Sequence, residues 1–317
     1  MKSITSVLTG SLLLLAATAT LAETRVTYKS AKTGSSYYQM AVELAEAMKK
    51  GSDGDISVTV EESQGSVQNV MEAGIRQGNY VFTTPPALVG LAQSGKAMFE
   101  GKRRPAFDEI RALFPIPSLT MHFVVASDSG IEDIAGLAGK TILLGKGSFG
   151  ATEGARYLTL FGLEGKVELA EVELSNAVAA LKNGQIDGFV TAGSWPAPNV
   201  IEAAASTGVQ VLSLDDEQIG TSGRTRMVIP AGTYSGQEED IVTTSLPVVA
   251  YTTTGMDEET AYQMTRTYWE QKQAMSGTSA WWGSVDAALM ENLGQLHAGA
   301  VRYYDEIGME LTAAQRP

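Results

Sequence analysis

Short apolar runs alternate with amphipathic segments along most of the chain. Residues 37–50, for example, place Met40, Leu44, Ala47 and Met48 on one face at helical spacing. The apolar or alternating runs predict strands at 25–31, 56–62, 80–84, 110–116, 121–127, 141–144, 167–174, 188–191 and 209–214. Helices are predicted at 37–50, 66–77, 131–138, 151–160, 176–183, 197–205, 257–275 and 287–307, with a further helix opened by Pro86.

The alternation of strands and helices predicts an α/β fold. It changes near residue 224, after which the chain is predicted to be extended to about residue 254, with a turn at 231–234. The remainder is predicted to be helical. A break of this kind indicates that the last third of the chain is organised differently from the middle third.

Residues 141–150 combine a short apolar strand with a Gly/Ser loop, directly before a predicted helix. Such a loop directs free backbone N–H groups at whatever lies over the helix start, where the helix dipole favours negative charge. Residues 28–38 have the same order of strand, Gly/Ser loop and helix. We therefore predict that two lobes, each offering a helix start, close on one anionic ligand.

The glycines Gly145, Gly147 and Gly150 match the spacing of the dinucleotide-binding fingerprint, and Glu168, Glu171 and Glu173 follow near the expected ribose-binding position. The Walker A alternative requires Lys and then Ser or Thr after Gly150, where this chain has Ala151 and Thr152. The start of the chain argues against the nicotinamide interpretation, because an exported protein has little free dinucleotide to bind. No cofactor is predicted.

The first 22 residues are typical of a secretory signal peptide. Lys2 provides the positive charge, residues 7–17 are apolar, and residues 20–22, Thr-Leu-Ala, form a small-residue cleavage site after Ala22. This apolar run is too short to span a bilayer. We expect the mature protein to be exported and free of the membrane.

The formal net charge of −13 becomes −14 when Lys2 is removed with the signal peptide, leaving 22 basic and 36 acidic side chains. Nonspecific binding to nucleic acid or to anionic membrane surfaces is not expected of such a protein. The chain has no cysteine, which excludes disulfides, thiolate catalysis and cysteine metal sites.

Sequence features of an enzyme are weak. The two histidines, His122 and His297, are far apart, and no His-Glu-x-x-His or Gly-x-Ser-x-Gly motif is present. His122 lies between Met121 and Phe123 and is expected to be a hydrogen-bonded histidine of a strand. Carboxylate pairs remote in sequence leave a hydrolase open as an alternative, and an exported ligand sensor is a second one.

Six segments, in this order, resemble the solute receptors of TRAP transporters, specifically the TAXI type. They are residues 32–38 (KTGSSYY), 63–69 (SQGSVQN), 128–131 (DSGI), 147–153 (GSFGATE), 183–188 (NGQIDG) and 229–234 (IPAGTY). The resemblance implies an α/β, two-lobed periplasmic binding protein of type II-like fold, each lobe a central sheet flanked by helices. It also implies hinge closure on a small organic anion, a dicarboxylate such as 2-oxoglutarate, or glutamate, which is delivered to the membrane subunits of a TRAP transporter.

By the same resemblance, residues 23–122 and 246–317 form lobe 1 and residues 123–245 form lobe 2. The expected oligomeric state is a monomer. The ligand-binding residues that it implies are Thr33, Gly34, Ser35, Ser36, Tyr37, Gly65, Ser66, Thr84, Gly147, Ser148, Phe149, Gly150, Thr152, Ser194 and Trp195.

Several of these residues have a second interpretation. Ser35 and Ser36 can cap a helix instead, Trp195 can line the pocket or pack between lobes, and only one of Tyr37 and Tyr38 can face the cleft. Thr84 and Pro86 stand where the family often has Gln and Asp, which favours a carboxylate ligand without an amine. Lys146 is expected to be an exposed loop lysine.

Overall fold

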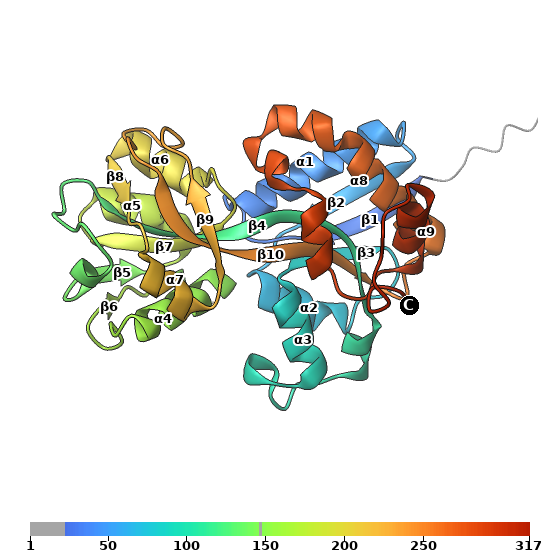
Figure 1. Ribbon diagram of the computed structural model, residues 1–317, viewed down its shortest axis with the longest axis horizontal. Coiled ribbons are helices and arrows are strands. Elements are labelled where there is room, and N and C mark those ends of the chain that lie inside the picture. Colours follow the sequence, from blue (N-terminus) through green and yellow to red (C-terminus); the bar gives the residue numbers. More distant parts are fainter. Residues whose placement is uncertain (1–22, 146–147) are drawn as a thin grey trace, which may run out of the picture.

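The computed structural model describes residues 23–145 and 148–317, so the predicted signal peptide lies outside the described residues. Two lobes lie side by side, and the long strands β4 (Ile110–Ala126) and β10 (Ile241–Thr253) run from one to the other (Figure 1). The predicted lobe boundaries fall inside these two strands, and the names lobe 1 and lobe 2 are kept for the predicted ranges. The two-lobed α/β architecture is confirmed.

The sheet of lobe 1 has the strand order β2-β1-β3-β10-β4. Its first three strands are parallel, whereas β10 is antiparallel to both of its neighbours. Helices α1, α8 and α9 cover one face, and α2 and α3 cover the other (Figure 1). The elements are β1 (Thr24–Lys29), α1 (Ser36–Gly51), β2 (Ile56–Glu61), α2 (Ser66–Ala73), β3 (Tyr80–Thr84), α3 (Pro86–Ser94), α8 (Glu258–Thr278) and α9 (Ala298–Glu306).

In lobe 2 the sheet continues in the order β4-β7-β5-β6, with β8 beside β4 and β9 beside β10. Helices α5 and α6 lie on one side of this sheet, and α4 and α7 lie on the other (Figure 1). The elements are β5 (Thr141–Leu143), α4 (Phe149–Leu160), β6 (Glu168–Leu169), α5 (Ala177–Lys182), β7 (Gly188–Gly193), α6 (Pro198–Ser206), β8 (Val209–Val211), α7 (Asp216–Ser222) and β9 (Thr225–Ile229).

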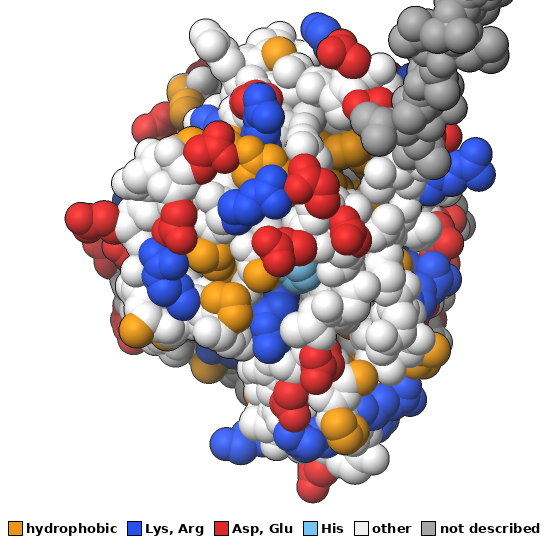
Figure 2. Space-filling view, turned by 90° about the vertical axis from the view of Figure 1, so that its right-hand side faces the viewer, with side chains coloured by type: hydrophobic (Ala, Val, Ile, Leu, Met, Phe, Trp, Pro, Cys, Tyr) orange, Lys and Arg blue, Asp and Glu red, His pale blue; other side chains and the backbone are white. Residues whose placement is uncertain are grey.

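Aromatic side chains fill the core of lobe 1 on both faces of its sheet. Phe114 stacks on Tyr268 of α8 with ring centroids 4.0 Å apart, and Phe82 stacks between Tyr80 and Tyr251. Trp281 and Trp282 are also buried in this core. On the end of lobe 1 remote from lobe 2, acidic and basic side chains are interspersed and apolar ones are scattered (Figure 2).

The prediction of two strands at 110–116 and 121–127 is wrong, because β4 is continuous from Ile110 to Ala126. Pro115 and Pro117 have no backbone N–H and therefore cannot donate a hydrogen bond to a neighbouring strand. The strand accommodates Pro117 at a register shift opposite β10, and the carbonyls of Pro115 and Pro117 accept hydrogen bonds from the hydroxyls of Tyr268 and Tyr37. Pairing with the distant strand β10 therefore keeps β4 continuous across the two prolines.

Three further local predictions fail, and one helix was not predicted at all. Helix α7 was not predicted, although Asp215 and Gln218 form a capping box at its start. The helix predicted at 287–307 is interrupted at Gly294, whose φ of 71° is left-handed. The predicted helix at 131–138 contains only a 3₁₀ turn around Gly136, and most of the predicted strand at 167–174 is unpaired because its neighbour β5 is three residues long.

Among the described residues, none of the helices has the length and apolar character that crossing a membrane requires.

Candidate ligand site between the lobes

A cavity of about 310 Å³ lies between the two lobes. Lobe 1 contributes the loop before α1, the loop before α2, and single residues of β4 and β10. Lobe 2 contributes the loop before α4, the segment around residue 174, the end of β7 and the start of α6. The lining residues are Ala31–Tyr37, Gln64–Ser66, Leu119, Leu144, Gly145, Ser148–Gly150, Glu173–Ser175, Val178, Val190–Gly193, Ala197–Asn199, Glu202 and Val248.

The start of α1 directs backbone donors at this cavity. Ser35 is the N-cap residue, and its hydroxyl accepts from the N–H of Tyr38 and donates to the carbonyl of Lys32. The N–H groups of Ser36 and Tyr37 have no acceptor among the described residues, as expected for the first turn of a helix. Tyr37 lines the cavity and Tyr38 does not.

The start of α4 is built in the same way from lobe 2. Ser148 is the N-cap residue, and its hydroxyl accepts from the N–H of Ala151 and donates to the carbonyl of Gly145. The N–H groups of Phe149 and Gly150 have no acceptor within the described parts of the chain. Both lie in the cavity wall.

Two more helices begin at the cavity without a side-chain cap. Helix α2 starts after Gly65, whose φ of 113° is readily adopted by glycine alone, and Ser66 follows in the cavity wall. Helix α6 starts after Ala197, with Pro198 at its first position, where the missing N–H costs no hydrogen bond. Four helix starts, two from each lobe, therefore lie at one cavity, and each of these helix ends favours negative charge, while the wall also carries the carboxylates of Glu173, which is paired with Lys32, and Glu202.

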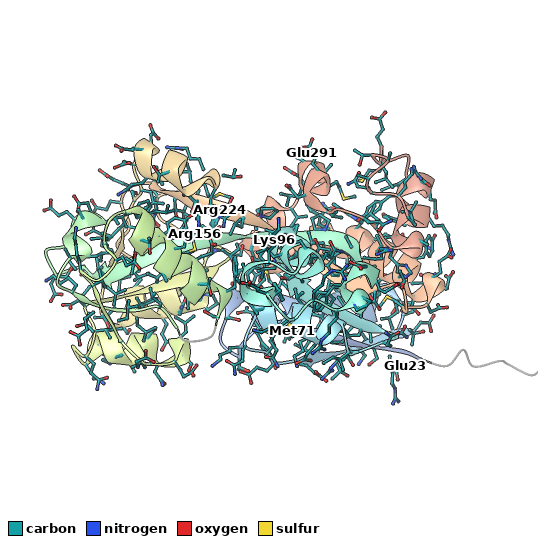
Figure 3. The ribbon with its side chains drawn as sticks, turned by 90° about the horizontal axis from the view of Figure 1, so that it is seen from below. Glu23, Met71, Lys96, Arg156, Arg224 and Glu291 are labelled. Atoms are coloured by element: carbon teal, nitrogen blue, oxygen red, sulfur yellow. The ribbon has the colours of Figure 1, made fainter. Side chains whose placement is uncertain are left out.

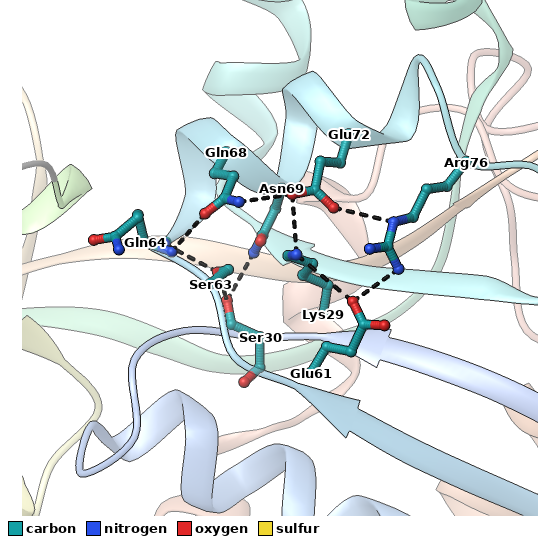
Figure 4. Close-up of polar contacts among 10 residues, drawn as sticks. Lys29, Ser30, Glu61, Ser63, Gln64, Gln68, Asn69, Glu72 and Arg76 are labelled. Carbon is teal, nitrogen blue, oxygen red and sulfur yellow. Dashed lines mark hydrogen bonds and ion pairs between the residues drawn. The ribbon is translucent and has the colours of Figure 1, made fainter.

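A polar network on lobe 1 holds the loop before α2 (Figure 4). The N–H of Gln64 donates to the side chain of Gln68, which donates to Glu72 at 2.7 Å. The buried ammonium of Lys29 lies 2.9 Å from Glu72. Arg76 contacts both Glu72 and Glu61, and its hydrogen bond to Glu61 holds the pKa of that carboxyl below its usual range. The network anchors the loop to the body of lobe 1.

A second ion-pair cluster anchors α4 in lobe 2. Glu153 lies one turn beyond the cavity and is 4 % exposed, and Arg224 contacts both of its carboxylate oxygens at 2.8–3.1 Å. Arg156 adds a contact to Glu153 and donates to the carbonyl of Ser222. Arg156 and Arg224 lie close together on lobe 2, on the side toward lobe 1 (Figure 3). Because moving α4 away from Arg224 would leave the buried carboxylate without its partner, the cluster fixes the position of the helix.

The lobes touch each other at the cavity. The hydroxyl of Ser36 accepts from the N–H of Ser194 at 3.0 Å, in a buried contact. A Cβ on Gly193 would lie 2.5 Å from the same hydroxyl, so only glycine allows this approach. Lys32 of lobe 1 forms an ion pair with Glu173 of lobe 2. The two lobes are therefore in direct contact beside the cavity.

The wall of the cavity differs between the lobes. Lobe 1 presents mainly hydroxyls and backbone groups from residues 33–37 and 64–66. Lobe 2 adds an apolar surface made of Leu144, Phe149, Leu174, Val178 and Val190. The apolar side chains of the wall therefore come mainly from lobe 2.

Most of the predicted site residues come together in this cavity. The lining includes Thr33, Gly34, Ser35, Ser36, Tyr37, Gly65, Ser66, Ser148, Phe149 and Gly150. Four of the predicted residues lie outside the lining, namely Thr84, Thr152, Ser194 and Trp195. Gly147 and Lys146 lie outside the described residues. Contact with a ligand stays a prediction for all of them.

Each of the four outlying residues has another environment. Thr84 is fully buried at the end of β3, and Thr152 is exposed on α4, where its hydroxyl donates to the carbonyl of Ser148. Ser194 contacts Ser36, as described above. Trp195 packs against the core of lobe 2.

Sequence reasoning missed the apolar part of the wall, because Leu174, Val178 and Val190 are indistinguishable from core residues in the sequence. A helix at 197–205 was predicted, but its start was not assigned to the site, although Pro198 at a helix start was a usable signal. Among the described residues, no group of three or more histidine, aspartate or glutamate side chains is arranged to hold a metal ion.

Comparison with known proteins identifies both a family and a fold. A family model described as the NMT1-like family matches residues 29–308. The structure of the periplasmic binding protein BugD aligns with a TM-score of 0.56 at 12 % identity, covering 91 % of this chain and 99 % of BugD. MatC (Rpa3494) from Rhodopseudomonas palustris with bound malate aligns with a TM-score of 0.56 at 12 % identity, covering 90 % and 97 %. At this identity the similarities establish the fold, that of the two-lobed periplasmic binding proteins.

Proposed function

Because the chain belongs to the NMT1-like family, we propose that it is an extracytoplasmic solute-binding receptor that captures a small organic anion between its lobes. The observation that carries the proposal is the convergence of four helix starts on one cavity. Each helix start contributes only about 0.3–2 kcal/mol to anion binding, whereas micromolar affinity requires about 8 kcal/mol. Contacts from both lobes are therefore needed, which couples binding to closure.

The hydroxyls of the cavity support binding and not chemistry. Those of Ser35 and Ser148 each donate to one backbone carbonyl and accept from one backbone N–H. Neither hydroxyl donates its proton to a side-chain base, as an activated nucleophile would. Both serines instead hold the helix starts in place.

The resemblance of the six sequence segments extends the proposal to a receptor of the TAXI type, exported to the periplasm as a monomer. It delivers its ligand to the membrane subunits of a TRAP transporter. The ligand is a dicarboxylate such as 2-oxoglutarate, or glutamate, and malate, which is bound in MatC, is a further candidate. Ligand bridging both lobes shifts the population toward the closed form, which the membrane subunits then recognise.

Thermal unfolding with added compounds tests the anion site. We expect 2-oxoglutarate, malate or glutamate to raise the melting temperature by several degrees, because a ligand at 100 times its Kd adds about 2.7 kcal/mol. Glucose and leucine are the neutral controls. Stabilisation by the neutral compounds alone would contradict an anion receptor.

A blocking variant locates the site. Ser66→Trp places an indole at the cavity wall while leaving the cap residue of α2 unchanged, and it should abolish the ligand-induced shift. Val42→Trp, at an exposed position of α1 outside the cavity, is the matched control and should keep the shift. Equal shifts in both variants would place the ligand elsewhere. Uptake by cells that express the membrane subunits, with and without this receptor, separates transport from sensing.

A further inference from the structure

His122 lies on β4, in the part of the strand that runs between the lobes, and it is fully buried. Its Nδ1 is 3.2 Å from the carbonyl of Thr120, and its Nε2 is 2.9 Å from the hydroxyl of Tyr234. A carbonyl can only accept, so Nδ1 carries the ring proton. The neutral Nε2 then accepts from the hydroxyl of Tyr234.

Tyr234 ends the segment 229–234, one of the six segments that carry the family resemblance, and it is 4 % exposed. Its main chain is fixed by Gln237, whose side chain accepts from the N–H of Tyr234 and whose N–H donates to the carbonyl of Tyr234. The hydroxyl oxygen of Tyr234 accepts from the N–H of Ala197 at 2.9 Å. Tyr234 therefore joins His122 to the residue that begins α6.

The start of α6 forms part of the cavity wall, through Ala197, Pro198 and Asn199. No side chain of its own cap residue holds it. Its second support is the amide of Asn199, which donates to the hydroxyl of Thr191, the residue paired with His122 across β4 and β7. One support of this helix start thus comes from Tyr234, between β9 and β10, and the other from Thr191 on β7.

We propose that His122 and Tyr234 are positioning residues of the ligand site, which fix the start of α6 against the crossing strand β4 so that the closed cavity has its ligand-binding shape. The inference rests on the proposed function. It assigns a role to the segment 229–234 and to the buried histidine, neither of which contacts the cavity.

The chemistry of the chain of hydrogen bonds supports this role. With the ring proton of His122 on Nδ1, the bonds run from Ala197 N–H to Tyr234, from Tyr234 to His122, and from His122 to the carbonyl of Thr120. Burial lowers the pKa of His122 to about 4, so the ring is neutral at neutral pH, as this series of hydrogen bonds requires. A protonated ring would leave the Tyr234 proton without its acceptor.

Three variants test the proposal. Tyr234→Phe removes both hydrogen bonds of the hydroxyl, and His122→Leu removes both of the ring. His122→Gln keeps them in principle, because its amide oxygen can accept from Tyr234 and its NH₂ can donate to Thr120. Tyr157→Phe is the matched control, since it removes a buried tyrosine hydrogen bond to Thr244 in the same lobe without touching α6.

The first readout is hydrogen exchange of the Ala197 amide without ligand. We expect about tenfold faster exchange in Tyr234→Phe and His122→Leu, corresponding to one lost hydrogen bond, and a rate near the wild type in His122→Gln and Tyr157→Phe. The Ala151 amide, which donates to Ser148 at the start of α4 and not to Tyr234, is the local control and should not change. Unchanged exchange at Ala197 in Tyr234→Phe would overturn the proposal.

The second readout is affinity for 2-oxoglutarate and malate, measured by calorimetry. We expect Tyr234→Phe and His122→Leu to weaken binding about tenfold or more, with His122→Gln and Tyr157→Phe within about threefold of wild type. Wild-type affinity in Tyr234→Phe, or a loss in His122→Gln equal to that in His122→Leu, would overturn the positioning role. Absence of binding to the wild type by any anion would instead contradict the proposed function, and the exchange rates would still decide whether the residues hold α6.

Discussion

The starts of α1 and α4 face the same cavity from opposite lobes and share one local structure. Their cap residues, Ser35 and Ser148, have the same φ of −84° and ψ values of 155° and 158°. Each hydroxyl accepts from the N–H three residues ahead and donates to the carbonyl three residues behind. The next residue differs, being Ser36 in lobe 1 and Phe149 in lobe 2.

This difference gives Ser36 and Phe149 different roles. The hydroxyl of Ser36 accepts a hydrogen bond from lobe 2 and so belongs to the contact between lobes, whereas the ring of Phe149 belongs to the apolar wall. A serine-capped helix start therefore presents free backbone N–H groups to the cavity in either lobe, and the following residue decides whether that start also bridges the lobes. Substitutions test this comparison. The largest effect is expected at the contact between the lobes and the smallest at the exposed ion pair of Lys32 and Glu173.

The largest effect is expected from Gly193→Ala. The new Cβ would lie 2.5 Å from the Ser36 hydroxyl, so the lobes cannot close fully. We expect a 10- to 100-fold loss of affinity for the anions that bind the wild type, as roughly 1–3 kcal/mol of overpacking implies, and a larger radius of gyration by X-ray scattering. Adding Ser36→Ala removes the clashing oxygen and leaves a Cβ contact of 3.6 Å, so the double variant should recover part of the affinity. A fully closed Gly193→Ala protein would refute the bridging role.

The next effect concerns α6, which lacks the serine cap and uses Tyr234 and His122 instead. The pKa of His122 is about 4 in the folded protein against 6.5 ordinarily, so the unfolded chain binds more protons between these values. The free energy of unfolding should therefore fall as the pH is lowered from 6.5 toward 4, by about 3 kcal/mol at most. His122→Gln should lack this component, while the contribution of His297 is common to both proteins and cancels. The free energy of unfolding is measured by denaturant titration at several pH values in this range. If it changed with pH by the same amount in both proteins, the expectation would be contradicted.

A smaller effect is expected at the two serine caps. Ser35→Ala and Ser148→Ala should each lower the free energy of unfolding by about 1 kcal/mol, which is a fall of roughly 2–4 °C in melting temperature. Because the two caps have the same geometry, the losses should agree within error. If calorimetry showed a loss of stability in only one of the two variants, the two caps would not be equivalent.

The smallest effect is expected at the ion pair of Lys32 and Glu173, whose side chains are 26 % and 48 % exposed. Exposed pairs contribute about 0–1 kcal/mol and weaken with salt. Lys32→Ala should therefore change affinity less than about fivefold, with the difference vanishing at 1 M NaCl. A tenfold loss that persists in high salt would assign Lys32 a direct contact with the ligand.

The helix starts at α1 and α4 were predictable because their signals are local. A serine after a glycine-containing loop, followed by a helical pattern, is sufficient to place a cap and its free N–H groups. The capping box of α7 was equally local and was overlooked. The strand β4 was not predictable in the same way, since Pro117 reads as a break unless its partner β10, more than 120 residues away, is known.

The sequence by itself determined the alternation of strands and helices, the helix starts that favour an anion, and the absence of cysteine chemistry. These follow from spacing, capping and composition, which act over a few residues. Only the tertiary structure decided which four helix starts share a cavity, that Gly193 admits Ser36, and that Tyr234 supports Ala197. Those contacts join residues 37 to 158 positions apart in the chain, and their geometry is set by two crossing strands whose pairing no local pattern specifies.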